Sequence, residues 1–322
     1  MENKTVLTEA VRDSLRTAPR FTNMYVSHVS VILFFQIEQE LLKKPRPTMD
    51  YTQFSDFHVH STLSDGADES EEIIRWAIRK GMPRLGFSEH SYAPCYAEFS
   101  LSEEAQKNYI SYISALKEKY KGQIELYCGI EQEYYSFTSV EGFDYVIGSL
   151  HHLALGGEYY PVDGEPEYLI EAAEKYFGGD RLSVAEEYFR AEATVAERTR
   201  CDIIGHFDLV SKMNERCSLF DTRSERYRKA WQSAADRLLA SGRPFEINTG
   251  AISRGYTSVP YPSPEICRYL AERGAKFILS GDSHRKENLC FGFEEWREKY
   301  TSLGADIIDF RPSHKVDKNK AV

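Results

Sequence analysis

The sequence predicts a distorted (β/α)7 barrel of the TIM-barrel type, with its reactive groups at the C-terminal ends of the strands. Strand-like and helix-like segments alternate through seven units from residue 54 onward, which is typical of a parallel sheet with helices outside it. Histidines and isolated carboxylates recur where the predicted strands end, and that face carries the chemistry of a parallel barrel. A doubly wound open sheet is the alternative, but no glycine-rich phosphate loop follows the first strand.

The elements are predicted from their apolar spacing and their boundary residues. The first strand covers residues 54–60, and the helix after it covers 70–81, with a serine at its start, acids in its first turn and a closing glycine. The remaining strands are expected at 84–90, 124–131, 143–152, 201–208, 244–250 and 276–284. The remaining helices are expected at 101–120, through most of 153–200, and at 223–241, 263–274 and 293–304.

The two ends of the chain depart from this pattern. Residues 1–48 contain the apolar run VSVILFF, which is too short and too late for a secretory signal. We expect them to form an N-terminal extension that is either not native, with Met49 as the natural start, or a helix that packs on the domain. The domain itself is expected at 49–311, and the polar residues 312–322 are expected to form a flexible tail.

Composition excludes several partners. The net charge of −10 and the absence of a basic tract disfavour a nucleic-acid partner, and a polymerase-associated exonuclease with it. No run of eighteen apolar residues occurs, so no membrane-spanning segment is expected. The six cysteines are scattered without a CxxC pair, which predicts reduced thiols and a cytoplasmic location. The oligomeric state stays open.

The stretch FSDFHVHSTLSDG places His58 and His60 on alternate positions of the first predicted strand. Alternate residues of a strand point to the same side, so the two imidazoles can bind one ion. Asp282 and His284 form a similar pair at the end of the last strand. The acidic turn that follows the first strand adds Asp65, although an SDG segment alone is usually only a turn.

Other predicted strands end in donors of the same kind. They are His90, Glu131, the pair His151 and His152, and His206. Each of these residues, taken alone, could have an ordinary structural role, such as a hydrogen-bonded core histidine or part of a loop. Together they point to metal, because clustered buried histidines would repel when protonated and lack partners when neutral. About nine donors without a cysteine suit two or three ions of zinc, manganese or iron, with a carboxylate that bridges them.

These motifs resemble those of the PHP (polymerase and histidinol phosphatase) superfamily, and within it the monofunctional histidinol-phosphate phosphatases. The matching stretches are DFHVHSTLSDG, GFSEH, GIEQEY, YVIGSLHHL, DIIGHFDLV, FEINTGAISRG and LSGDSH, from about residue 54 to residue 290. The resemblance implies a trinuclear site on a seven-stranded barrel. It implies one ion on His58, His60, Glu131 and Asp282, a second on Asp65, His90 and His284, and a third on Glu131, His151 and His206.

Two details of that ligand set stand out. His151 rather than His152 is implied because it directly follows the GSL segment. Asp65 stands where many relatives carry histidine, and an aspartate ligand would favour manganese or iron over zinc.

The resemblance also implies an enzyme that hydrolyses L-histidinol phosphate to histidinol and phosphate in histidine biosynthesis, by attack of a metal-bridged hydroxide. A PHP phosphoesterase for another small phosphorylated substrate, a nucleotide or phosphotyrosine, is the alternative. A non-catalytic metal- or phosphate-binding module is a more remote one. The tyrosine-rich region 153–200 could be a lid over the site or ordinary helical packing.

Substrate and catalytic residues are less sharply indicated. Arg254 is the first candidate to bind the phosphate, because arginine can hold it with two hydrogen bonds. Arg190 and Arg216 are suggested by rough alignment to the family, and each could instead be a solvated surface arginine. Asp208 could orient a ligand histidine or protonate the leaving group, and it could also be a simple turn carboxylate. His90 counts as a candidate catalytic residue as well as a ligand.

Overall fold

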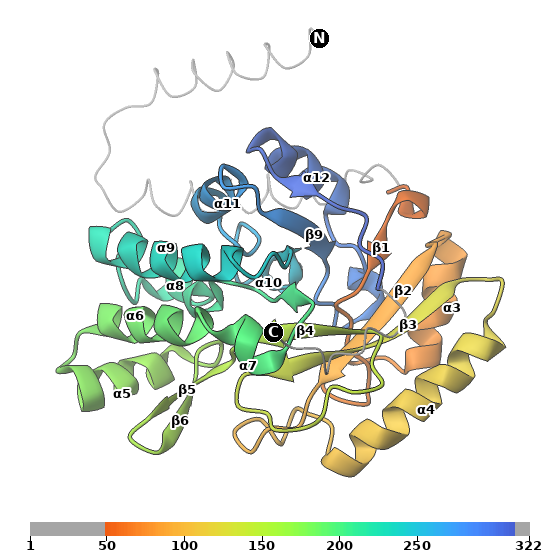
Figure 1. Ribbon diagram of the computed structural model, residues 1–322, viewed down its shortest axis with the longest axis horizontal. Coiled ribbons are helices and arrows are strands. Elements are labelled where there is room, and N and C mark those ends of the chain that lie inside the picture. Colours follow the sequence, from red (N-terminus) through yellow and green to blue (C-terminus); the bar gives the residue numbers. More distant parts are fainter. Residues whose placement is uncertain (1–48, 313–322) are drawn as a thin grey trace, which may run out of the picture. The chain divides into compact units, whose positions relative to one another are not determined.

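Eight parallel strands form one sheet that helices wrap from outside, as the computed structural model shows for the described residues, 49–312 (Figure 1). The order is β1-β2-β3-β4-β7-β8-β9-β10. The strands are β1 (Ser55–Asp56), β2 (Arg84–His90), β3 (Glu125–Glu133), β4 (Tyr145–Ser149), β7 (Ile203–Ile204), β8 (Phe245–Asn248), β9 (Lys276–Ser280) and β10 (Asp306–Ile307). The predictions about residues 1–48 and 313–322 lie outside the described part of the chain.

The seam of the barrel lies between the chain after β1 and the chain after β9. Val59 and Ser283 form a parallel bridge there. The backbone N–H of His60 donates to the carbonyl of Ser283 at 3.0 Å, and the N–H of Ser283 donates to the carbonyl of His58 at 2.9 Å. The first seven strands therefore close at their C-terminal end, which confirms the predicted distorted (β/α)7 barrel.

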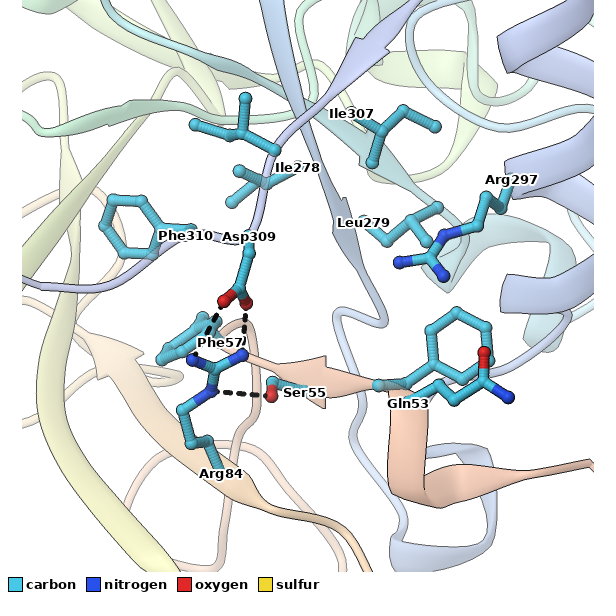
Figure 2. A pocket seen from close by; sticks show the side chains of 12 residues that line it. Gln53, Ser55, Phe57, Arg84, Ile278, Leu279, Arg297, Ile307, Asp309 and Phe310 are labelled. Carbon is cyan, nitrogen blue, oxygen red and sulfur yellow. Dashed lines mark hydrogen bonds and ion pairs between the residues drawn. The ribbon is translucent and has the colours of Figure 1, made fainter.

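The opposite end of the barrel is closed by the last described segment. β10 pairs with the start of β9, so that Asp306 lies beside Lys276. The side chain of Asp309 forms an ion pair with Arg84, and a small cavity beside them is lined largely by apolar side chains (Figure 2). The ring of Phe310 packs on Phe57 at 5.4 Å between centroids. This end is thus closed by one ion pair and by apolar side chains, and the histidine-rich cluster described below lies at the C-terminal end.

The helices follow the predicted order and cover the outside of the sheet. They are α3 (Ser70–Lys80), α4 (Glu103–Lys119), α5 (Pro166–Phe177), α6 (Arg181–Glu192), α7 (Val195–Thr199), α9 (Glu225–Leu239), α11 (Pro264–Ala271) and α12 (Phe293–Ser302). Short turns at α8 (Asn214–Cys217), α10 (Gly250–Ser253), η1 (Tyr51–Gln53), η2 (Leu209–Ser211) and η3 (Lys286–Asn288) complete the set. Within the described ranges, no helix is long and apolar enough to cross a bilayer.

The local sequence explains where these helices begin and end. In α3, Glu71 and Glu72 occupy the first turn, and Gly81 follows the last turn with a φ of 77°. In α4, the hydroxyl of Ser102 accepts a hydrogen bond from the N–H of Ala105. The hairpin of β5 (His152–Leu155) and β6 (Glu158–Pro161) differs from the sequence prediction, which is helix through most of residues 153–200. Its two central residues, Gly156 and Gly157, have positive φ.

Tyr145 fills the interior of the barrel. Its hydroxyl lies 2.6 Å from the carbonyl oxygen of Phe57 and 2.9 Å from that of Phe87. Gly86 and Gly129 make room for its ring, since a Cβ at either position would clash with it. This packed layer separates the apolar closed end from the polar end described next.

Candidate metal centre

Glu131, near the end of β3, is the carboxylate on which imidazoles from four other strand ends converge. Its Oε2 lies 3.2 Å from Nε2 of His58 and 2.9 Å from Nδ1 of His90. Its Oε1 lies 3.0 Å from Nε2 of His206 and 3.4 Å from Nε2 of His151. All five side chains are buried. Parallel strands end on one face, so residues as far apart in the sequence as His58 and His206 meet at Glu131.

Two aspartates extend the cluster toward the seam of the barrel. Oδ1 of Asp282 lies 3.6 Å from Nε2 of His60 and 3.5 Å from Nδ1 of His284. Oδ2 of Asp65 lies 3.0 Å from Nε2 of His284. His90 takes part in both halves, since its Nε2 lies 3.6 Å from Asp65. The structure therefore brings together all nine residues that the sequence suggested as metal ligands.

The donors of the cluster fit divalent ions. Three sets have one ligand atom per residue within 4.8 Å of one another: His60, Asp65, His90 and His284; His58, His60 and Glu131; and His90, Glu131 and His151. Among the described residues, Nε2 of His58, both ring nitrogens of His60 and Oε2 of Glu131 are buried without a well-aligned hydrogen bond, although the rings of His58 and His90 lie close to Oε2. Buried polar atoms rarely lack partners, and metal coordination would supply them.

The electrostatics of the cluster prepare some residues for metal binding and require others to lose a proton first. Burial lowers the pKa of His58, His90 and His151, but Glu131 and the other carboxylates beside these rings outweigh burial and raise that pKa above its usual range, so metal binding would displace a proton from them. Burial, together with the neighbouring His90 and His284, holds the pKa of His60 well below its usual range, so that this imidazole is neutral. Burial alone would raise the pKa of Glu131, but the surrounding histidines outweigh it and hold that pKa well below its usual range. A neutral imidazole and an ionised carboxylate are the species that bind divalent metals.

Two buried carboxylates orient ligand histidines, and the sequence interpretation missed both. Oε1 of Glu246, in β8, lies 2.7 Å from Nδ1 of His58. Oε2 of Glu133, at the end of β3, lies 2.7 Å from Nδ1 of His151. Such partners fix which ring nitrogen carries the proton and leave the other nitrogen free to bind metal. A signal existed, since Glu133 is two positions after Glu131 and therefore on the same side of its strand.

Arg254 lies at the rim of the cluster. Its Nη1 donates to the carbonyl oxygen of Asp282 at 3.1 Å, and its Nη2 lies 3.2 Å from the carboxylate of the same residue. Nη1 is also 2.6 Å from Nδ1 of His284. The side chain is 26% exposed, so the guanidinium is held in place and still reaches solvent.

The two other arginines lie elsewhere. Arg216 donates to the carbonyl of Gly255 and lies over the ring of Tyr256 at 5.2 Å, next to the segment that holds Arg254. Arg190 lies in solvent on α6, where its side chain is 71% exposed and pairs with Glu187 of the same helix. This position gives no support to a role of Arg190 in substrate binding.

Asp208 contacts no histidine of the cluster through a hydrogen bond. Its Oδ2 accepts from the backbone N–H of Ser263 at 3.1 Å, and its buried Oδ1 has no partner among the described residues. Burial raises the pKa of Asp208 to about 6, although the bond from Ser263 acts in the opposite direction.

Lys212 is a cation near the cluster that the sequence interpretation missed. Its Nζ lies 2.9 Å from the carbonyl oxygen of Asp163 and 3.3 Å from its carboxylate. Burial raises the pKa of Asp163, but Lys212 and the histidines at positions 151, 152 and 206 outweigh it and lower that pKa to about 2.

Part of the tyrosine-rich region 153–200 packs as ordinary structure. The rings of Tyr160 and Tyr176 contact each other, and both hydroxyls donate to Glu158. Tyr188 is buried and donates to the carbonyl of Phe207 at 3.2 Å.

The chain is similar to a family model, to sequence relatives and to a solved structure. The model of the PHP domain family matches residues 56–250. A probable histidinol-phosphatase of Deinococcus radiodurans is 27% identical over 271 residues, which cover 81% of this chain and 97% of the relative. A probable histidinol-phosphatase of Schizosaccharomyces pombe is 29% identical over 233 residues, which cover 66% of this chain and 74% of the relative. The histidinol phosphate phosphatase of Lactococcus lactis was solved with zinc, L-histidinol and phosphate. Its structure superposes on this chain with a TM-score of 0.60 at 21% sequence identity, and the match covers 79% of this chain and 95% of that protein.

Proposed function

The chain belongs to the PHP domain family, and from this premise we propose that it is a metal-dependent phosphatase that hydrolyses L-histidinol phosphate to L-histidinol and phosphate. The observation that carries the proposal is the convergence of four imidazoles on Glu131, with Asp65 and Asp282 beside them. The relatives described as histidinol-phosphatases support the choice of substrate.

The cluster is proposed to hold two or three divalent ions of zinc, manganese or iron. Its donor sets overlap at His60, His90 and Glu131, so these three residues lie where neighbouring ions would be held. Bound ions supply Lewis acidity, which offsets the charge of a phosphate ester and makes a hydroxide nucleophile available near neutral pH. Glu246 and Glu133 hold the protons of His58 and His151 away from the cluster.

Arg254 is proposed to bind the phosphate. Its contacts with Asp282 and His284 fix the guanidinium beside the donors. A guanidinium has five N–H donors in a planar fork, so those not used by the protein remain for phosphate oxygens. Arg216 supports the segment next to Arg254 and is proposed to act through it.

Asp208 is proposed to return a proton to the leaving alkoxide. Its free Oδ1 and its pKa of about 6 favour this role over that of orienting a histidine, since no hydrogen bond joins it to one. We further propose a cytoplasmic location, which agrees with six free cysteines in the chain.

The test is phosphate release from histidinol phosphate, nucleoside monophosphates and phosphotyrosine, measured with metal-stripped protein that is reloaded with zinc, manganese or iron. We expect kcat/KM to be highest for histidinol phosphate and activity to depend on the metal. Glu131→Gln should abolish release, whereas Glu118→Gln, an exposed surface change, should leave it intact. Equal kcat/KM for all esters would reject the substrate, and full activity without metal would reject the mechanism.

A further inference from the structure

A separate group of metal-binding side chains lies beside the main cluster. Cys95, Glu133 and His152 each place one ligand atom within 4.8 Å of the others. Cys95 comes from the loop between β2 and α4, Glu133 ends β3, and His152 begins β5. The sequence offered His152 only as the alternative to His151 and did not suggest Cys95 or Glu133, and none of the three belongs to the donor sets around Glu131.

Two of these residues carry buried polar atoms that lack partners. Nδ1 of His152 and Oε1 of Glu133 have no hydrogen-bond partner among the described residues. The two residues are only 5% and 1% exposed, so water does not reach them freely. The other oxygen of Glu133 is used, since it accepts from the backbone and the ring of His151. The group of three residues therefore holds one imidazole nitrogen and one carboxylate oxygen without hydrogen-bond partners, next to a thiol.

We propose that Cys95, Glu133 and His152 form a further binding site for a borderline-soft divalent cation such as zinc. A thiolate and a carboxylate together balance the charge of the ion, and the neutral imidazole is the third ligand. Zinc prefers four ligands of this mixed kind in a tetrahedral arrangement, and water would occupy the fourth position. On binding, the thiol of Cys95 loses its proton to solvent and the sulfur forms the bond to the metal.

The sulfur ligand distinguishes this site from the main cluster, whose donors are all nitrogen and oxygen. Thiolate selects zinc and similar ions over manganese and magnesium. Glu133 also connects the two sites, because its Oε2 holds His151 while its Oε1 is free for the further ion. The inference rests on this geometry and does not depend on which phosphate ester the protein hydrolyses.

Cobalt tests the site in the full-length protein, because cobalt bound to a thiolate gives a charge-transfer band in the near ultraviolet that nitrogen and oxygen ligands do not give. Metal-stripped wild type, Cys95→Ser, His152→Gln and Cys217→Ser are titrated with Co²⁺, followed by absorbance and by bound metal per chain. Cys217 is an exposed cysteine of α8 and is the matched control.

We expect the band in the wild type and in Cys217→Ser, and its loss in Cys95→Ser and His152→Gln with about one fewer ion bound per chain. No band in the wild type, or a band that survives either of the two site substitutions, would overturn the proposal.

Alkylation of the unmodified protein, mapped by mass spectrometry, gives a second measurement without any substitution. Zinc should protect Cys95 and leave Cys217 reactive, and equal alkylation of Cys95 with and without zinc would also overturn it. Phosphatase activity is scored separately, so this inference and the proposed function can fail independently.

Discussion

Replacing Glu246 by glutamine tests whether a buried carboxylate prepares His58 for metal binding. Glu246 is 1% exposed, and its Oε1 lies 2.7 Å from Nδ1 of His58 and 2.7 Å from the hydroxyl of Ser280. The carboxylate can only accept from His58, so it fixes the ring proton on Nδ1 and leaves Nε2 free. An amide of the same shape can present its oxygen or its NH2 group, and the proton is then no longer fixed.

The expected loss follows from that change. Removing the partner of a ligand histidine typically costs about 10–100-fold in metal affinity or activity, which is about 1.4–2.8 kcal/mol. Because glutamine keeps the volume and can still bond Ser280, the free energy of unfolding of the metal-free protein should fall by only about 1 kcal/mol.

The assay is a competition titration of metal-stripped protein with zinc and manganese, together with kcat/KM for histidinol phosphate at saturating metal. Glu118→Gln is the control, since it removes the same charge from an exposed pair with Lys121. Metal affinity and kcat/KM of Glu246→Gln within about twofold of the wild type would refute the assigned role of this carboxylate.

Three further predictions follow from other contacts. Arg254→Ala should lower kcat/KM by about 100-fold and weaken inhibition by inorganic phosphate, with Arg254→Lys in between; unchanged phosphate inhibition would contradict the role of Arg254. Asp208→Asn should raise the free energy of unfolding by about 3 kcal/mol at pH 8 and by about half of that at pH 5, measured by urea denaturation. Burial raises the folded-state pKa of Asp208 to about 6, so ionisation of this carboxyl destabilises the folded wild type increasingly as pH rises from about 4 to 6. The stability gained by Asp208→Asn should therefore grow with pH, and a gain that does not grow would contradict the raised pKa. Tyr145→Phe should lower the free energy of unfolding by about 1–2 kcal/mol, because the single hydroxyl hydrogen that lies between two buried carbonyls is lost. Tyr168→Phe, at a residue that is 44% exposed, should change it little.

The sequence was sufficient to place the main donor set because the barrel obeys one simple rule. Parallel strands end on one face, so His58, Glu131 and His206 could be brought together without any knowledge of distances. Helix α3 could be located from the acids of its first turn and the glycine after its last turn. The seven-stranded closure was also predicted, although strand β10 was missed because two residues carry no measurable periodicity.

The remaining misses have physical reasons. The hairpin of β5 and β6 was obscured by helix-forming residues around it, although the pair Gly156 and Gly157 was a turn signal. The role of Glu246 does not show in the sequence, because this buried glutamate acts only through its partner His58. Cys95 was overlooked because the cysteines lack any regular spacing, and its proximity to His152 exists only in three dimensions.

The seam of the barrel has a consequence for the order of events during synthesis. The bridge between Val59 and Ser283 joins the earliest donors of the chain to the latest ones. A nascent chain that has not yet released residues 276–284 from the ribosome lacks Asp282 and His284, two of the nine donors of the cluster. A product that ends before β9 would therefore lack both the closing bridge and the donor set of His60, Asp65, His90 and His284, while the sets around Glu131 would keep their donors.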